Sequence, residues 1–388
     1  MDYKTKEYYR NEIKLISEAI KISELYIAKK IVEIAESKDN KKERHIGYYL
    51  ISKGREELNN KLGVKGKKKT HPEQKVRRYI VFIYLITSLL SMLTAFFIYL
   101  GTKSIIGAII NFIILYIPIS EVVIQIINNI LNKKVKPCLI PKLDFEHGIP
   151  KEYSTFVVIP TIVNSKEKVQ ELMKKLEVYY LANKSENLYF ALLGDCTSGQ
   201  KEVEKVDNEI IEAGIEEVNK LNKKYNSNSE NEIPKFNFLY RKRIWNKNEG
   251  GYLGWERKRG LLCEFNDFLI NGNDKFRINT IVGANCVRPQ KNIKYVITLD
   301  SDTNLTLDSG LNLIGAMAHV LNEPILDREN RVVIDGHALI QPRVGVNLED
   351  SRKSFFAKVY SGTRRNRFLH KCYIRYISRQ FWWRNFYR

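Results

Sequence analysis

The sequence predicts an α/β domain with a mostly parallel sheet, preceded by a helical region and a pair of membrane-spanning helices. Strand-like and helix-like segments alternate from Tyr153 onward, as they do in α/β domains. Residues 79–102 hold no charged side chain, and about twenty apolar residues suffice to cross a bilayer. Residues 1–63 repeat apolar side chains at helical spacing among lysines and glutamates, which predicts amphipathic helices.

The charge distribution favours a membrane surface over nucleic acid as the partner of the basic side chains. The chain has 388 residues and a formal net charge of +20, which would suit either anionic partner. The basic clusters at residues 66–78 and 132–136 flank the apolar runs. Headgroups of membrane lipids therefore account for them, and no nucleic acid is expected. The five cysteines are scattered without metal-ligand spacing, which indicates a reduced, cytosolic environment.

Residues 79–127 are predicted to form a transmembrane helical hairpin. A second uncharged run, residues 104–120, follows Lys103 and is extended by residues 122–127. The alternative, a buried soluble hairpin, would need both helices coated by protein on every face. Basic flanks at both outer ends place those ends in the cytoplasm by the positive-inside rule. We expect a multi-pass protein of the cytoplasmic membrane, with its N-terminal region and its α/β domain on the cytoplasmic side.

Apolar runs, caps and breakers set the predicted elements. Pro160 is expected to end the first strand, Ser165 to cap the first helix of the α/β domain, and Gly63 to end the N-terminal helical region. The predicted strands are residues 155–159, 188–193, 236–240, 295–299 and 332–341. The predicted helices are residues 45–62, 165–182, 202–225, 255–269 and one around 311–321.

Two carboxylates stand directly after the strand at residues 295–299. Asp300 and Asp302 are separated by one serine, and open α/β sheets bind ligands at the carboxyl ends of their strands. Such a pair suits Mg²⁺ or Mn²⁺, held by one or two carboxylates and completed by substrate phosphates. A solvated turn is the alternative, because acidic pairs are common where loops begin.

Other charged residues share this predicted edge. Asp195 follows the second strand, and Lys258 and Arg259 begin a helix where cations can neutralise a diphosphate. An acid near a base or ribose, a cationic helix and a metal-binding acid pair together describe a nucleotide-sugar site. The chain has no G-x-x-x-x-G-K-[ST] motif, and P-T-I-V-N rather than a glycine-rich turn follows the first strand. These features exclude a P-loop and disfavour dinucleotide binding.

Longer motifs carry a family resemblance. The motifs are G-Y-Y-L-I-S-K-G-R-E-E-L from Gly47, L-I-P-K-L-D-F-E-H-G-I-P-K-E-Y from Leu139, V-V-I-P-T from Val157, L-E-V-Y-Y-L-A-N from Leu176, F-A-L-L-G-D from Phe190, L-G-W-E-R-K-R-G from Leu253, Y-V-I-T-L-D-S-D-T from Tyr295, G-A-M-A-H from Gly315 and Q-P-R-V from Gln341. With these motifs in this order over about residues 47–362, the chain resembles the N-terminal glycosyltransferase region of cyclic β-1,2-glucan synthases, a family-84-like glycosyltransferase.

The resemblance implies a GT-A-like fold that uses UDP-glucose and a divalent metal, Mg²⁺ or Mn²⁺. It implies glucose transfer to a growing β-1,2-glucan acceptor at the cytoplasmic face, with inversion at the anomeric carbon. The general base of that reaction is expected beyond residue 362, so no catalytic base is assigned here. Asp300 and Asp302 correspond to the metal ligands. The nucleotide-sugar-binding residues implied by the resemblance are Thr161, Asp195, Lys258, Arg259 and Asp300.

Residues 363–388 depart from the family. They hold eight arginines and lysines and no acid. Plausible codons for them, shifted by one base, encode a string that resembles the family's own continuation. We expect a frameshift near Gly362, from mutation or sequencing error; a genuine basic tail that binds lipid or RNA is the alternative. The chain would then be a truncated, weakly active or inactive glucosyltransferase, or a non-catalytic membrane protein such as a donor-binding remnant.

The predicted organisation has four parts. Residues 1–78 form a helical cytoplasmic region, and residues 79–127 form the transmembrane hairpin. Residues 128–362 form an incomplete GT-A-like domain, and residues 363–388 are the frameshifted tail.

Overall fold

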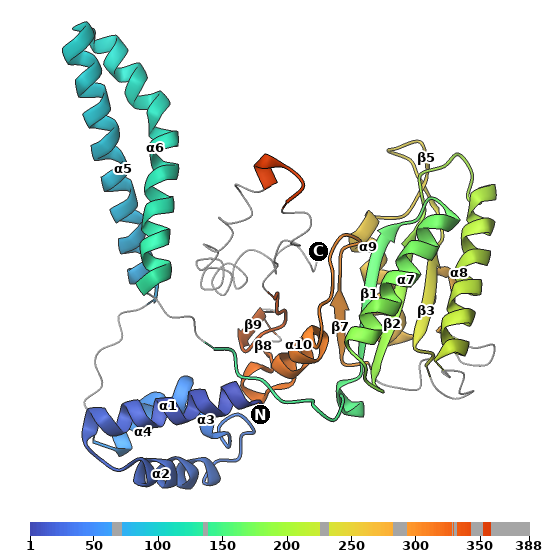
Figure 1. Cartoon of the computed structure of the whole chain (residues 1–388), viewed down its shortest axis with the longest axis horizontal. Helices are drawn as coiled ribbons and strands as arrows, with labels where there is room; N and C mark the ends of the chain where they lie inside the picture. The colour runs from blue at the N-terminus through green and yellow to red at the C-terminus, as the bar shows by residue number, and fades with distance from the viewer. Residues whose placement is uncertain are drawn as a thin grey trace. The chain divides into compact units, whose positions relative to one another are not determined.

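A computed structural model describes residues 1–63, 72–134, 139–225, 233–281, 293–327, 329, 332–342 and 352–357 (Figure 1). The chain separates into two compact units. The first unit is Met1–Tyr3 with Pro141–Asn322, and the second is Lys4–Ile140 with Glu323–Arg388. The four-part organisation predicted from the sequence stays a prediction, and residues 363–388, for which a frameshift is predicted, lie outside the described residues.

The first unit is built on a five-stranded sheet with the order β6-β3-β2-β1-β7. Neighbouring pairs among β1, β2, β3 and β7 are parallel, and β6 is antiparallel to β3. The predicted α/β class with a mostly parallel sheet is therefore confirmed. The strands are β1 (Thr155–Ile162), β2 (Leu188–Asp195), β3 (Phe236–Arg241), β6 (Phe276–Asn279) and β7 (Tyr295–Thr298).

Helices cover both faces of this sheet (Figure 1). Val157 and Ile159 of β1 belong to the apolar cluster that contains residues of α7, α8 and α10. Phe156 and Val158 point to the other face, into a cluster with α9, because successive strand residues alternate between faces. The helices are α7 (Lys166–Ala182), α8 (Lys205–Lys224), α9 (Arg257–Asn271) and α10 (Ser309–Ala318), with short 3₁₀ helices η1 (Lys151–Tyr153) and η2 (Val320–Asn322).

β1 continues through Pro160, so the prediction that this proline ends the strand is wrong. Pro160 pairs with Leu193 of β2, whereas the pairing with β7 ends at Val158. The carbonyl of Val158 accepts a hydrogen bond from the N–H of Leu299 at 2.9 Å. Residues two apart in a strand direct their backbone groups to the same side. The nitrogen of Pro160 therefore points to the β7 side of β1, past the last paired residue of β7. The missing N–H there costs no hydrogen bond of the sheet.

Ser165 caps α7 as predicted, since its side chain accepts from the N–H of Lys168. Other boundaries moved. The last predicted strand, residues 332–341, is the short β9 (Val332–Asp335), which pairs with β8 (Ile325–Asp327) outside the main sheet. Its apolar run is only three residues long, and it pairs with β8, the strand just before it in the chain. A second hairpin, β4 (Ile244–Asn246) and β5 (Gly251–Leu253), carried no signal strong enough to predict it.

The second unit begins with helices α1 (Tyr3–Ile20), α2 (Glu24–Glu36), α3 (Ile46–Ile51) and α4 (Arg55–Lys61). The predicted helix at residues 45–62 is therefore broken between α3 and α4. Gly54 lies at this break, and a Cβ there would come within 2.5 Å of the Tyr48 ring. Gly63 has a φ of +67° and follows α4, as expected for a glycine that ends a helix. Lys42 is buried and donates to Asp335 of β9 at 2.9 Å.

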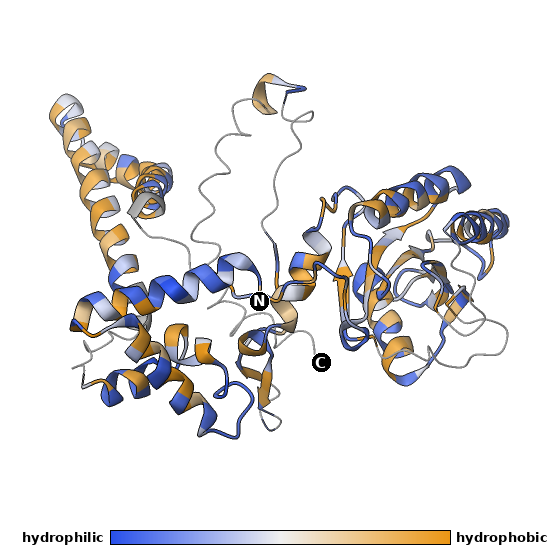
Figure 2. Cartoon of the chain, turned by 60° about the horizontal axis from the view of Figure 1, so that its bottom comes forward, coloured by the Kyte–Doolittle hydropathy of each residue, from blue (hydrophilic) through white to orange (hydrophobic). Residues whose placement is uncertain are grey.

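The two predicted membrane spans are helices α5 (Pro72–Thr102) and α6 (Ile105–Lys134). Arg77–Thr102 and Ile105–Leu131 are long and apolar enough to cross a membrane. Only 11% of the most apolar stretch of α5 and 0% of that of α6 is buried. The hydrophobic residues coloured orange along these helices in Figure 2 therefore do not form a soluble core. This exposure favours a membrane hairpin over the soluble alternative. Its orientation in the membrane stays a prediction.

Candidate nucleotide-sugar site

The parallel register brings the predicted site residues to one edge of the sheet. Thr161 of β1 pairs with Gly194 of β2, and Ile162 pairs with Asp195. β7 runs parallel to β1 on its other side and ends at Thr298, two residues before Asp300. Thr161, Asp195 and Asp300 therefore all lie at the carboxyl edge, where open α/β sheets bind ligands.

The acid pair lies on a tight turn. The carbonyl of Asp300 accepts a hydrogen bond from the N–H of Thr303 at 3.0 Å. Both Asp300 and Asp302 are exposed. The ammonium of Lys258, in the first turn of α9, contacts Oδ1 of Asp300. The structure thus brings together a cation expected to hold phosphate and a carboxylate expected to hold a metal.

The three cations that begin α9 point to different places. Arg259 pairs with Glu256 on its own helix at 3.2 Å. Arg257 instead reaches the loop after β2: its Nη2 donates to Oγ of Ser198 at 2.7 Å, and its Nη1 to the carbonyl of Cys196 at 3.4 Å. Sequence reasoning did not single out Arg257. Glu256 and Arg257 both have positive φ, so the direction of each side chain could not be taken from helical spacing.

Asp195 is buried, with only 1% of its surface exposed. Its Oδ1 accepts from the N–H of Cys196 at 3.0 Å and lies 3.5 Å from Nη1 of Arg241. Its Oδ2 is buried and has no hydrogen-bond partner among the described residues. Burial raises the pKa of Asp195, although Arg241 and Arg257 act in the opposite direction. The free oxygen is an unused acceptor directly at the carboxyl edge, which is the kind of group a ligand donor satisfies.

Arg241 connects Asp195 to the start of α9. It is fully buried and held by Glu264 through two bonds of 2.9 and 2.8 Å. It also donates to the carbonyls of Trp255 at 2.5 Å and Arg257 at 3.1 Å. A buried charge is tolerated when it is paired and its donors are used in this way. Sequence reasoning missed Arg241 and Glu264, because charged residues are expected on the surface.

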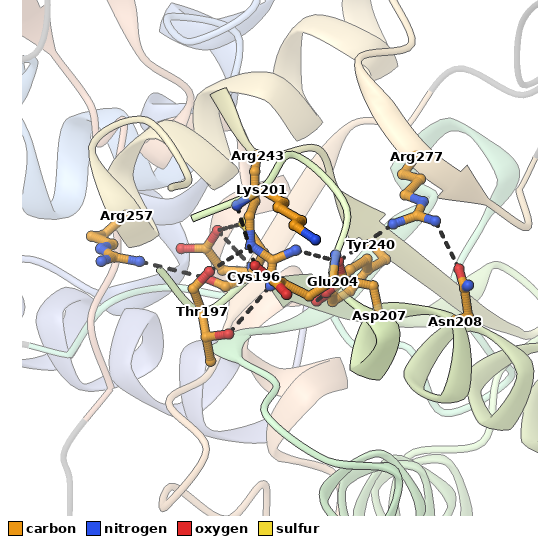
Figure 3. A network of polar contacts seen from close by, with 11 residues as sticks. Cys196, Thr197, Lys201, Glu204, Asp207, Asn208, Tyr240, Arg243, Arg257 and Arg277 are labelled. Atoms are coloured by element: carbon orange, nitrogen blue, oxygen red, sulfur yellow. Dashed lines mark hydrogen bonds and ion pairs between the residues drawn. The ribbon is translucent and has the colours of Figure 1, made fainter. Parts of the chain in front are cut away.

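A second buried network braces the loop after β2 (Figure 3). Arg243 contacts Asp207 and donates from Nε to the carbonyl of Thr197 at 2.7 Å. Oδ1 of Asp207 accepts from the hydroxyl of Tyr240 at 2.8 Å, and Oδ2 lies 3.4 Å from Arg277. Burial alone would raise the pKa of Asp207, but hydrogen bonds from Arg243, the backbone and Tyr240 lower it overall. The loop that follows Asp195 is therefore fixed from two sides, by Arg243 and by Arg257.

The β4–β5 hairpin lies against the same loop. Gly199 and Tyr252 exchange two backbone hydrogen bonds, each of 2.9 Å. A pocket of about 210 Å³ opens on the hairpin. It is lined by Ile244, Trp245, Asn246, Lys247, Asn248, Leu253 and Trp255. The Asp195 loop and the start of α9 are thus linked by one aromatic hairpin.

The fit of a divalent cation rests on few ligands. Across the described parts of the chain, no group of three or more histidine, cysteine, aspartate or glutamate side chains could hold a metal. Asp300 and Asp302 are two exposed carboxylates on one turn. Mg²⁺ is commonly held by one or two carboxylates, with substrate phosphates and water completing its shell. The residues present fit a cation of that kind.

Comparison with known proteins points first to a class. No protein-family model matches the chain, but its sequence is similar to that of a glucan synthase. That relative is the cyclic beta-(1,2)-glucan synthase NdvB of Rhizobium meliloti (strain 1021). The two are 29% identical over 374 residues, which is 93% of this chain and 13% of the relative. The similarity supports the relation to cyclic β-1,2-glucan synthases indicated by the motifs.

Proposed function

We propose that the first unit is the donor-binding part of a membrane-bound glucosyltransferase with a GT-A-like fold. It binds UDP-glucose together with Mg²⁺ or Mn²⁺ and serves the transfer of glucose to a growing β-1,2-glucan, with inversion. The observation that carries this proposal is the Lys258–Asp300 contact at the carboxyl edge of β7. It joins a cation suited to binding phosphate and a carboxylate suited to binding a metal. Both lie at the carboxyl edge of the sheet, where β2 also ends at Asp195.

Each residue has a distinct part in donor binding. The free Oδ2 of Asp195 accepts a hydrogen bond from the uracil or the ribose, and Thr161 lies one strand away. Lys258 binds the diphosphate, and its positive charge offsets the negative charge that develops on UDP as it leaves. Arg257 and Arg259 surround the same helix start, where the helix N-terminus also favours anions. Asp300 and Asp302 would hold a divalent cation, whose charge would offset the negative charge of the departing diphosphate.

Inversion also requires a general base that deprotonates the acceptor hydroxyl. We place that base outside residues 1–362, because the resemblance puts it in the segment replaced by the predicted frameshifted tail. Resequencing the gene across residues 359–373 tests the frameshift. In this proposal the chain binds donor but transfers little or no glucose.

Radiolabelled UDP-glucose supplied to membranes that contain the full chain tests this activity statement. We expect donor to be retained on the protein in a Mn²⁺-dependent manner, with little labelled glucan formed. The matched control is the same membrane carrying Asp302→Ala, which should retain no donor. Metal-dependent formation of β-1,2-glucan by the wild-type chain alone would contradict the expected inactivity and would require a base within this sequence.

A further inference from the structure

Helix α7 presents a row of polar side chains to the loop that carries the acid pair. Lys175 and Tyr179 are four residues apart and lie on one helical face, and Asn183 caps the helix four residues later. Nζ of Lys175 donates to the carbonyl of Ser301 at 2.6 Å. The hydroxyl of Tyr179 contacts the carbonyl of Thr303. Nδ2 of Asn183 donates to the carbonyl of Thr306 at 3.3 Å.

Two of these three side chains are buried, and Lys175 is partly buried. Tyr179 is 1% exposed and Asn183 is 0% exposed. Oδ1 of Asn183 also accepts from the N–H of Gly310 at 2.8 Å, at the beginning of α10. The loop between β7 and α10 is therefore attached to α7 along its whole length, through its own backbone groups.

The acid turn is bound from both faces of the sheet. On one face, side chains of α7 donate hydrogen bonds to the carbonyls of Ser301 and Thr303, the two residues on either side of Asp302. From the other face, Lys258 of α9 contacts the side chain of Asp300. Burial lowers the pKa of Lys175, and the carboxylate of Asp302 acts in the opposite direction, which agrees with their proximity. The positions of the two carboxylates thus depend on separate helices.

We propose that Lys175 and Tyr179 are positioning residues, which hold the Asp300–Thr303 turn so that both carboxylates address one divalent cation. This inference rests on the proposed function, since it takes Asp300 and Asp302 as the metal ligands. An unheld turn would have to be ordered when the cation binds, at a cost in backbone conformational entropy. Functional groups held beforehand by their supporting contacts avoid that cost.

The test measures Mn²⁺ binding to the full detergent-solubilised chain in the presence of UDP. Binding is followed by the loss of the electron paramagnetic resonance signal of free Mn²⁺. We expect Tyr179→Phe to weaken Mn²⁺ binding by about tenfold, as loss of one buried hydrogen bond would. The matched control is Tyr180→Phe, on the same helix. Tyr180 packs its ring against Phe236 at 5.3 Å between centroids, away from the acid turn, and its variant should bind Mn²⁺ as the wild type does.

Substitution of Lys175 gives a second variant, which leaves the buried ring of Tyr179 unchanged. Lys175→Met removes the donor to Ser301 and should weaken Mn²⁺ binding, whereas Lys175→Arg keeps a donor and should restore most of it. Melting temperatures measured without Mn²⁺ show which variants fold. If Tyr179→Phe fails to fold, the Lys175 pair decides.

The outcomes separate the two proposals. If Asp302→Ala binds Mn²⁺ as tightly as the wild type, the metal assignment itself is wrong, and the positioning proposal with it. If Asp302→Ala abolishes binding while Lys175→Met and Tyr179→Phe leave it unchanged, the metal site stands and the positioning role is overturned. Equal weakening by Tyr180→Phe would also overturn it, because the effect would then not depend on the acid turn.

Discussion

Replacement of Asp302 by alanine is expected to reduce Mn²⁺-dependent UDP binding by roughly a hundredfold or more. Asp302 is one of only two carboxylates on the turn after β7, and no cluster of three or more candidate ligands exists in the described residues. Removing one of two protein ligands should therefore cost at least as much as removal of an outer-shell partner, which commonly costs 10–100-fold. Titration of UDP in the presence and absence of Mn²⁺ measures the effect.

The control for charge is Asp308→Asn, which removes one negative charge from the same loop. Asp308 is exposed and begins α10 with a φ of +52°, a conformation that asparagine tolerates. We expect this variant to bind UDP and Mn²⁺ as the wild type does. Binding by Asp302→Ala that still depends on Mn²⁺ and is as tight as the wild type would refute the assignment of this acid pair.

Replacement of Asp207 by alanine is expected to give the largest loss of stability, about 3–5 kcal/mol in the free energy of unfolding, as when one partner of a buried ion pair is removed. Asp207 is fully buried and accepts from Tyr240, Arg243 and the N–H of Glu204. The substitution leaves the buried Arg243 guanidinium without its carboxylate. Denaturant unfolding of the solubilised chain measures this loss.

The double variant Asp207→Ala with Arg243→Met is the control, because it removes the unpaired charge as well. It should be less destabilised than Asp207→Ala alone, since replacing both partners of a buried pair is often close to neutral. A single variant within the error of the wild type would contradict the account of this network. The contribution of Asp207 to stability can also be tested by its pH dependence. The pKa of Asp207 is lowered in the fold from 3.8, so its stabilisation is present above that value and is lost as the pH falls below it.

Much of the fold could be predicted because the decisive residues are apolar runs with clear ends. β2 is buried along all eight residues, and the sequence shows it as an uninterrupted apolar run that stops at Gly194-Asp195. The acid pair could be placed at the sheet edge for the same reason. The effect of Pro160 on β1 was misjudged, because a proline ends a strand only if its nitrogen faces a paired neighbour. Pro160 pairs with β2, whereas the pairing of β1 with β7 ends at Val158.

The support of the site could not be predicted, because it consists of charges that ordinary patterning assigns to solvent. Arg241 and Glu264 form a buried pair, and nothing in the spacing of the two residues reveals it. Arg257 was overlooked in favour of Arg259, and the left-handed backbone at Glu256 and Arg257 decides which of these cations faces Asp195. Lys175 and Tyr179 read as ordinary helix residues until the loop after β7 is placed beside them.

Photoaffinity labelling with an azido-uridine analogue of UDP-glucose tests the location of the donor site most directly. The full chain is labelled in the presence of Mn²⁺, with and without excess UDP, and the modified peptides are identified by mass spectrometry. We expect labelling at the ends of β1 and β2, in the peptides that contain Thr161 and Asp195, and its disappearance with excess UDP. Labelling confined to α1–α4, or labelling of any peptide that excess UDP does not reduce, would contradict a donor site at this edge of the sheet.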